Sequence, residues 1–580
     1  MCTMEKDFDF YERNVLVIGS GAAGARCAIE LDKNDVEVFV VSKRSYGDAH
    51  TTWARGGINA ALGSLDSEDS WKIHAVDTLK EGHFINNPEA VRCVAENMPT
   101  VIRELEEWGL DFDKTDSGEI NQRYFGAQSY RRTCFVGDRT GEAIMDTLVE
   151  TAKEQEIEYK DDLYITDLLR SNGRVCGAMG YDMTTGSPVV VSAKCTVVAA
   201  GGHTAIYNRH SSREDENNGD GVALAYDAGA ELMDMEFVQF HPTGMSGERY
   251  GEKWDGRLVT EAVRGEGGRL YNELGERFME EYSPEKMELD ARDIVARAIE
   301  TEIREERGTK NNAVYLDISH RDEEFIKDRL PTMYSRFKQL GVNIAEEPME
   351  VAPTAHYIMG GVNINPATGE TNVSGLRAIG ETTAGVHGAN RLGGNSLAET
   401  LAIGKLTGQS IAEDISEMKF EENITSCIPK QSVPTGDKGE YAPEELISEL
   451  QRTMEKNVGI QCNKSSLEKA LEDIQEIEEK LEDVSSLMSI TDRKFESYQN
   501  LLNMLLAAKA TTKGALYREE SRGAHYRTDN PEMLPEYKKN LIYTKDSGSM
   551  TIKEQSVKPV PSYLQDVLKE GHELDYHHLE

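Results

Sequence analysis

The sequence predicts an α/β protein: a doubly wound, dinucleotide-binding domain, an inserted α+β capping domain and a helical C-terminal domain. Three observations lead to this prediction. A strand, glycine turn, helix and second strand follow one another near the N-terminus, helical and strand patterns alternate after them, and the composition changes to Glu/Lys-rich helix beyond Ile411. Alternating strands and helices are typical of a parallel sheet covered by helices.

The first unit occupies residues 14–42. The apolar run Val15–Ile18 predicts a strand, the turn Gly19-Ser20-Gly21-Ala22-Ala23-Gly24 follows it, a helix continues to Leu31, and Val36–Val41 predicts the second strand. A glycine turn in this position lets the backbone approach a pyrophosphate and directs helix N–H groups at it. The acidic ribose ligand of NAD-binding proteins is absent, because Ser42 and Lys43 end the second strand.

Later segments extend the same domain. Residues 87–108 and 139–154 show helical patterns, and residues 175–183 and 189–198 read as strands, the last leading into Ala199-Ala200-Gly201-Gly202. A second polar turn, Asn218-Gly219-Asp220-Gly221, precedes a helix. From the sequence this turn fits two roles equally, as a cofactor contact or as a helix cap.

Changes in pattern predict the domain bounds. The dinucleotide domain is expected in two parts, residues 8–244 and 351–428, around an irregular, charged capping domain at 245–350. A loop at 429–443 predicts a linker to the helical domain at 440–545, with long helices at 444–483 and 491–516. Residues 546–580 are expected to form an extended tail on the body of the protein.

Composition excludes several classes of partner and site. The chain has 580 residues, enough for a large buried site, and its net charge of −39 argues against nucleic-acid and direct phospholipid binding. No apolar run reaches membrane-spanning length and no basic signal region opens the chain, so we expect a cytoplasmic protein without membrane insertion of its own. Its eight cysteines include no Cys-x-x-Cys pair, so no metal site is predicted and an iron–sulfur relay would belong to another chain.

Five further segments carry candidate chemistry. The most informative is His387-Gly388-Ala389-Asn390-Arg391-Leu392-Gly393-Gly394-Asn395-Ser396, which places a cation and an imidazole beside a turn that opens onto an apolar helix. Four more precede it: His50-Thr51-Thr52-Trp53-Ala54-Arg55-Gly56-Gly57, Phe240-His241-Pro242-Thr243-Gly244, Thr260–Gly268 with Asp290–Asp293, and Thr354-Ala355-His356. Their order and spacing resemble the succinate dehydrogenase/fumarate reductase flavoprotein subunit family, and the resemblance extends to Tyr517–His525.

The resemblance implies FAD as cofactor. His50 matches the histidine that bonds covalently to the flavin in that family, which would raise the flavin potential enough to accept electrons from succinate. The start of the helix at Asn395 would place its positive end near the flavin. The cofactor-binding residues expected on this basis are Gly19, Gly21, Ala22, Ala23, Gly24, Ser42, Lys43, His50, Thr51, Gly56, Gly57, Ala200, Gly201, Asp220, Glu381, Asn395, Ser396 and Leu397.

The resemblance also implies how a small dicarboxylate is held and protonated. His241 with Thr260 would hold one carboxylate, and His356 with Arg391 the other. Arg292 would donate the proton when fumarate is reduced and accept it when succinate is oxidised. Glu261 and Arg264 would relay that proton.

The main hypothesis is therefore an FAD-containing subunit that interconverts succinate and fumarate and exchanges electrons with an iron–sulfur partner subunit. A membrane anchor for that partner is left open, so the subunit is expected in the cytoplasm or at the cytoplasmic face of the membrane. One alternative is a soluble, thiol-driven fumarate reductase subunit.

L-Aspartate oxidase and a non-catalytic flavoprotein fit the sequence less well. L-Aspartate oxidase carries a loop resembling Arg-Glu-Gly-Gly-His whose Glu accepts a hydrogen bond from the substrate ammonium, whereas this chain has Tyr124-Phe125-Gly126-Ala127-Gln128. Phe125 cannot accept that bond, and aspartate oxidase normally lacks the histidine found here at His50. A non-catalytic flavoprotein is disfavoured because Arg292 and Arg391 are both present.

Overall fold

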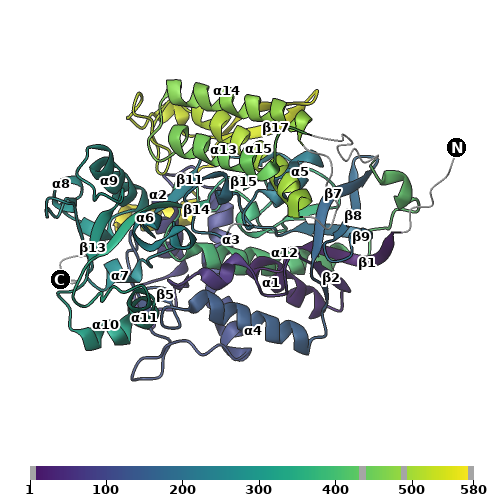
Figure 1. Ribbon diagram of the computed structural model, residues 1–580. Coiled ribbons are helices and arrows are strands. Elements are labelled where there is room, and N and C mark those ends of the chain that lie inside the picture. The colour runs from purple at the N-terminus through teal and green to yellow at the C-terminus, as the bar shows by residue number, and fades with distance from the viewer. Residues whose placement is uncertain (1–7, 214, 430–438, 485–492, 573–580) are drawn as a thin grey trace.

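The computed structural model describes residues 8–213, 215–429, 439–484 and 493–572. Figure 1 shows a large sheet with its helices, a smaller sheet with short helices, and a layer of long helices from the C-terminal part of the chain. This arrangement confirms the predicted fold class. No helix among the described residues is long and apolar enough to cross a membrane.

A seven-stranded sheet forms the centre of the dinucleotide domain. Its order is β6 (Glu158–Lys160), β2 (Val38–Val41), β1 (Asp9–Ile18), β9 (Pro188–Val198), β8 (Arg174–Asp182) and β7 (Leu163–Ser171), with β16 (Leu376–Ala378) paired to β9. The strands β6, β2, β1, β9 and β16 are parallel, and β8 and β7 are antiparallel. All four residues of β2 are buried, as expected for a strand covered on both faces.

Helices cover this sheet. The first helix, α1 (Ala22–Asp32), packs on α12 (Asn395–Asp414) and α4 (Thr140–Glu154), while α3 (Pro88–Glu107) packs on α12 and on α2 (Trp71–Glu81). The contact between α1 and α12 is close because glycines of α12 face the backbone of α1. A Cβ added at Gly404 would lie 2.8 Å from the Ala23 carbonyl oxygen, and one at Gly408 would lie 2.9 Å from that of Cys27.

The capping domain has its own sheet and core. The sheet runs β11 (Val238–Met245), β14 (Met349–Ile358), β13 (Val314–Asp317), β12 (Arg269–Tyr271), all antiparallel. Its helices are α6 (Gly247–Tyr250), α7 (Ala262–Gly265), α8 (Met279–Tyr282), α9 (Arg292–Arg304), α10 (Glu323–Arg329) and α11 (Pro331–Gln339). Since β11 and β14 span the expected bounds at 244/245 and 350/351, the cap is joined to the dinucleotide domain by continuous strands.

Short elements complete the cavity walls and connections. Strands β3 (Ile58–Asn59), β5 (Thr133–Cys134) and β4 (Gln122–Arg123) form a three-stranded sheet. The 3-10 helices are η1 (His50–Trp53), η2 (Thr204–Ile206), η3 (Glu252–Trp254), η4 (Met287–Leu289), η5 (Gly380–Thr382), η6 (Ile424–Cys427), η7 (Leu481–Asp483) and η8 (Pro535–Tyr537). The seven described cysteines are free; Cys2 lies outside the described residues.

The C-terminal helices differ from the prediction in one place. The helix expected at 444–483 is two helices, α13 (Pro443–Asn457) and α14 (Lys464–Lys480), which pack on α15 (Arg493–Tyr517). The break has a local cause, because the Asn463 side chain accepts a hydrogen bond from the Ser466 amide (3.0 Å) and so starts a new helix. Of the expected linker at 429–443, residues 430–438 lie outside the described residues.

The region expected as an extended tail is folded. Strands β17 (Lys539–Asp546) and β18 (Ser549–Ser556) form a hairpin that joins β10 (Leu232–Met233) and β15 (Gly361–Val362) in a four-stranded sheet. After it, α16 (Ser562–Glu570) packs on α2, and α5 (Asp220–Asp227) packs on α15. The predicted bound at 545/546 therefore falls inside a hairpin; residues 573–580 lie outside the described residues.

The close packing of α1 on α12 predicts the effect of Gly404→Val. A side chain there must displace the backbone of α1, so we expect a loss of about 1–3 kcal/mol in the free energy of unfolding and a lower Tm. Glu413→Val is the matched control, because Glu413 lies on the same helix and is exposed. Equal Tm values for the two variants in thermal unfolding would show that the helices do not depend on this contact.

Candidate active site

One cavity gathers most of the residues predicted from the sequence. Its walls include all the expected cofactor-binding residues except Gly24 and Asn395, and all the expected catalytic and substrate-binding residues except Arg264. The first group comes from the carboxyl ends of β1, β2 and β9 and from η1, η5 and the start of α12, and the second comes from the capping domain and the segment before α12. Segments far apart in sequence therefore meet at one site.

The three exceptions lie outside the cavity lining and contact other groups of the chain. Gly24 packs on the glycine turn, since an added Cβ would lie 2.0 Å from the Gly19 carbonyl oxygen. The Asn395 side chain accepts a hydrogen bond from the Asn59 amide (2.8 Å) and donates one to Thr78 Oγ1 (2.9 Å). Arg264 stands behind Glu261, at 3.8 Å, and donates to the Glu288 carbonyl.

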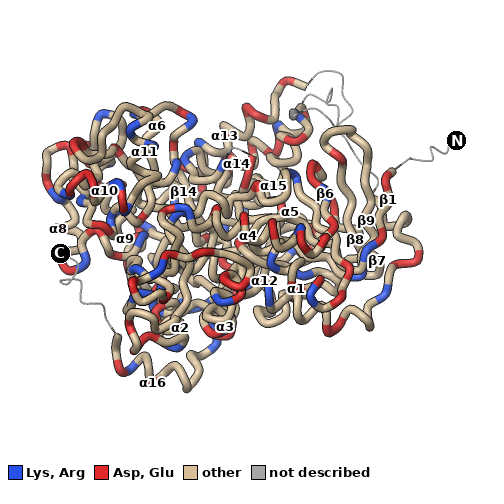
Figure 2. The backbone as a smooth tube through the Cα atoms, turned by 90° about the horizontal axis from the view of Figure 1, so that it is seen from below, with Lys and Arg blue, Asp and Glu red and all other residues tan. Residues whose placement is uncertain are grey.

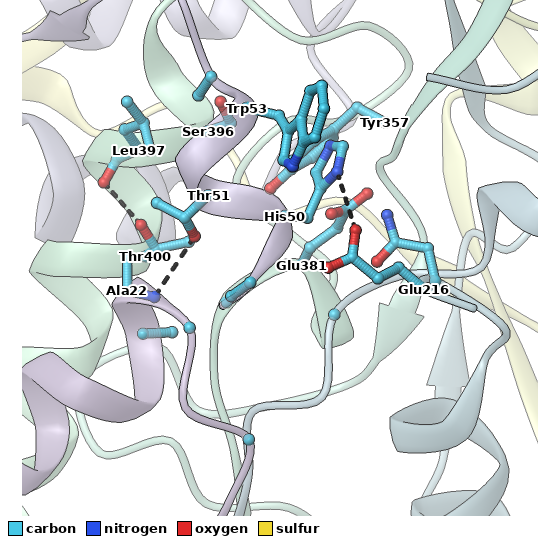
Figure 3. A pocket seen from close by; sticks show the side chains of 18 of the residues that line it. Ala22, His50, Thr51, Trp53, Glu216, Tyr357, Glu381, Ser396, Leu397 and Thr400 are labelled. Atoms are coloured by element: carbon cyan, nitrogen blue, oxygen red, sulfur yellow. Dashed lines mark hydrogen bonds and ion pairs between the residues drawn. The ribbon is translucent and has the colours of Figure 1, made fainter. Parts of the chain in front are cut away.

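The glycine turn shapes one end of the cavity. Gly19 has φ +111°, and a Cβ there would lie 2.2 Å from the Ala199 carbonyl oxygen, so only glycine allows β1 and β9 to approach in this way. At the start of α1, the Gly21 N-cap makes no side-chain hydrogen bond and the Ala22 amide lies 3.4 Å from Thr51 Oγ1 (Figure 3). A helix N-terminus in a cavity wall fits a pyrophosphate.

The second polar turn lies at the start of α5 and beside the cavity, and its N-cap residue, Gly219, makes no side-chain cap hydrogen bond. Asp220 begins α5, and its carboxylate also lines the cavity, 2.6 Å from Lys43 Nζ. Its other oxygen accepts a hydrogen bond from Asn503 (2.8 Å). Lys43 in turn lies over the Tyr164 ring, 4.9 Å from its centroid. These contacts fix a carboxylate and an ammonium beside the cavity, where hydroxyl and phosphate groups of a dinucleotide would meet them.

His50 faces two carboxyl groups (Figure 3). Its Nδ1 atom lies 3.7 Å from Glu216 Oε2, and neither atom has a hydrogen-bond partner among the described residues. Burial acts to lower the pKa of His50, but the Glu216 carboxylate outweighs it and raises that pKa. Burial acts to raise the pKa of Glu216, but His50 and Arg213 lower it to about 2. Burial raises the pKa of Glu381, the second of these carboxyl groups, to about 7.

An ion pair of Arg292 and Glu261 lies in the part of the cavity lined by the expected substrate-binding residues. Arg292, the first residue of α9, donates from Nε (2.9 Å) and Nη2 (2.6 Å) to Glu261 Oε2. Burial acts to raise the pKa of Glu261, but the charges of Arg292 and Arg264 hold it far below its usual value. Burial lowers the pKa of Arg264. Glu261 is therefore a carboxylate shared by two arginines.

Two neutral histidines lie beside this pair. The rings of His241 and His356 are 5.3 Å apart and nearly perpendicular. Burial, and then the positive charge of Arg292, lower the pKa of His241 far below its usual value. Burial, and then the positive charge of Arg391, do the same to the pKa of His356. Because the Thr243 amide donates to His241 Nδ1 (3.2 Å), the proton of that ring is on Nε2. Both rings can thus bind an oxygen without adding charge.

Arg391 brings unpaired donors into the site. It is buried, its guanidinium lies 4.5 Å from the Tyr357 ring centroid, and its Nε and Nη2 atoms have no hydrogen-bond partner in the part of the chain that the structure describes. Burial, and then the charge of Arg292, lower the pKa of Arg391 to about 9, so it stays a cation at neutral pH. A buried cation without a carboxylate partner is costly unless an anion binds beside it. The site therefore fits a small dianion.

Sequence patterns did not reveal several residues that shape the site. Three of them are brought into contact with predicted residues by the fold: Glu216 with His50, Gln239 with Arg292, and Tyr357 with Arg391. Gln239 also stands two positions before His241 on the same strand. Phe125 also lies in the cavity wall, where its ring fills the space beside Gly56. A Cβ added at Gly56 would lie 2.5 Å from the Phe125 ring. The apolar ring at Phe125 offers no carboxylate to meet an ammonium group.

Comparisons with known proteins agree with this geometry. Residues 14–397 match the family described as "FAD binding domain", and residues 447–566 match "Fumarate reductase flavoprotein C-term". Among solved structures, the quinol fumarate reductase of E. coli aligns with a TM-score of 0.89 and 30% identity, covering 95% of this chain and 97% of that one. Mycobacterium smegmatis Sdh1 aligns with a TM-score of 0.85 and 37% identity, covering 96% of each chain.

Curated relatives point the same way. The chain is 46% identical to a subunit of "Fumarate reductase (CoM/CoB)" from Methanothermobacter marburgensis, over 92% of this chain and 97% of the relative. It is 35% identical to a mitochondrial flavoprotein subunit of "Succinate dehydrogenase [ubiquinone]" from Xenopus laevis, over 91% and 82%. The chain therefore belongs to the succinate dehydrogenase/fumarate reductase flavoprotein subunit family and is an FAD-dependent oxidoreductase of that type.

Proposed function

We propose that this chain is the catalytic subunit of a thiol-driven fumarate reductase, which interconverts fumarate and succinate. The observation that carries the substrate assignment is Arg391, a buried cation with unpaired donors next to a second arginine and two neutral histidines. A short dianion would satisfy these donors at both of its ends.

The proposed roles follow from the positions of the side chains. Arg391 and His356 bind one carboxylate, and His241 and Thr260 bind the other, which fixes the carbon–carbon bond beside Arg292. FAD, when bound, supplies the hydride. Arg292 supplies the proton, and Glu261, already hydrogen-bonded to two of its nitrogens, stabilises the guanidinium and passes a proton back from Arg264.

The electron donor is inferred from the relatives. The main hypothesis from the sequence did not single out a donor, whereas the 46% identity to a CoM/CoB fumarate reductase subunit, compared with 35% for a ubiquinone-linked one, favours the thiol-driven alternative. We infer that electrons reach the flavin from thiols through an iron–sulfur partner subunit. The acidic residues are spread over the whole molecule (Figure 2). Because their negative charge repels a dianion at long range, the cavity cations attract it only at short range.

Covalent attachment of the flavin through His50 is part of the proposal. His50 lines the cavity and faces Glu216, which is positioned to stabilise a positive charge on the ring. A positive charge next to the flavin would favour its reduced form, in keeping with the raised potential that the resemblance implies.

The donor assignment is tested with the chain co-purified with its iron–sulfur partner. We expect fumarate to be reduced at the expense of the CoM and CoB thiols, and quinols to be inactive as donors. Thiol loss and succinate formation are measured together, and heat-inactivated complex is the control. Activity with a quinol and none with the thiols would contradict the donor assignment while leaving the substrate assignment intact.

Arg292→Ala tests the proton donor. Without a positioned acid we expect kcat for fumarate reduction to fall by at least about 10²-fold, with the flavin still bound, because Arg292 lies with Glu261 and not among the glycine turns. Arg292→Lys keeps a positive charge and a transferable proton but not the planar guanidinium, so it separates loss of the acid from loss of its hydrogen-bond geometry. An Ala variant that retains wild-type turnover would remove Arg292 from the mechanism.

His50→Ser tests the covalent bond. We expect flavin fluorescence to stay with the wild-type polypeptide on a denaturing gel and to be lost from the variant. Because the noncovalent flavin has a lower potential, succinate oxidation should fall more than fumarate reduction. Flavin released from the denatured wild-type chain would exclude the bond, and unchanged succinate oxidation in the variant would exclude the effect on potential.

A further inference from the structure

A second cavity lies on the other side of the catalytic arginine. Its lining includes both acidic and basic side chains, among them Lys80, Glu81, His83, Asp293, Arg297 and Arg522. Glu81 ends α2 and Asp293 follows Arg292 at the start of α9. Between this cavity and the active site stand two fully buried amides, Asn390 and Gln239.

A chain of hydrogen bonds connects the two cavities. Arg292 Nη1 donates to Gln239 Oε1 (3.2 Å), and Gln239 Nε2 donates to Asn390 Oδ1 (2.7 Å). Asn390 Nδ2 then donates to Glu81 Oε1 (2.7 Å) and to Asp293 Oδ1 (2.8 Å). These hydrogen bonds all run from Arg292 towards the two carboxyl groups.

The two carboxyl groups decide the orientation of both amides. Because each hydrogen of the Asn390 amino group meets a carboxyl oxygen, Asn390 must turn its own oxygen towards Gln239. Gln239 then donates to that oxygen and to the Arg391 carbonyl (2.9 Å), which leaves its oxygen facing Arg292. The opposite orientation would place amide hydrogens against a guanidinium, which has only donors.

We propose that Glu81 is a positioning residue for proton transfer: through Asn390 and Gln239 it holds the Arg292 guanidinium in place against Glu261. This inference rests on the proposed function, in which Arg292 is the proton donor. Arg292 has two hydrogen bonds to Glu261 on one side, and the Gln239 oxygen is its partner on the other. Losing that second partner would let the guanidinium rotate about its contact with Glu261.

Asp293 alone would fix the Asn390 amide less firmly than Asp293 and Glu81 together. It also forms an ion pair with Arg297 (3.0 Å), so its carboxylate is shared. Loss of hydration, and then the negative charges of Asp293 and Asp290, raise the pKa of Glu81 well above its usual value. With or without its proton, Glu81 retains an oxygen that accepts from Asn390.

The test compares Glu81→Leu with Glu81→Gln. Leu removes the acceptor, and we expect kcat for fumarate reduction with reduced viologen to fall about 10- to 100-fold with little change in KM, since the residues that bind the carboxylates remain. Gln keeps an acceptor oxygen and should restore most of the kcat. Glu285→Leu is the matched control, because Glu285 lines the same cavity, is exposed and lies outside the hydrogen-bond chain.

Crystal structures of the same variants provide a readout that does not depend on activity. We expect the Arg292–Gln239 hydrogen bond to be lost in the Leu variant and kept in the Gln variant, with flavin content unchanged in both. A Leu variant with the wild-type kcat and an intact Arg292–Gln239 bond, or equal loss of kcat in both variants, would overturn the inference. If the wild-type enzyme did not reduce fumarate, the proposed function would fail, and the structures would still decide whether Glu81 positions Arg292.

Discussion

An excess of buried positive charge is the constraint on which this site depends. Arg292 and Arg264 share one carboxylate, Glu261, and two donor atoms of the buried Arg391 have no partner among the described residues. The histidines next to them are neutral because burial and these cations lower their pKa values. An arrangement of this kind is stabilised when an anion enters, so the same charge that destabilises the fold favours binding of a dicarboxylate.

The fold keeps these charges together by joining separate parts of the chain. Strands β11 and β14 run from the dinucleotide domain into the cap and carry His241 and His356 side by side. The start of α9 brings Arg292 to them, and the segment before α12 brings Arg391. Buried amides at Gln239 and Asn390 tie these elements together, and the Gln239 oxygen accepts a hydrogen bond from the Arg292 guanidinium.

Local signals were enough to predict the framework but not the contacts between its parts. The βαβ unit around Gly19 follows from a buried strand and a glycine turn, and the side chains that line the cavity were expected from the resemblance of their motifs to the flavoprotein family. The break at Asn463 had a local signal, a helix-capping residue, that the helical pattern concealed. The pairing of Glu216 with His50 and the hairpin of β17 and β18 depend on long-range contacts, which no local pattern records.

The account is tested most directly by reducing the purified chain with an artificial low-potential donor and following its reoxidation. We expect fumarate to reoxidise it, and L-aspartate with oxygen to give no peroxide, because Phe125 offers no acceptor for an ammonium group while Arg391 offers donors for a second carboxylate. Reoxidation by fumarate without aspartate oxidation would support the dicarboxylate site. Peroxide formation from aspartate, with no response to fumarate, would contradict it.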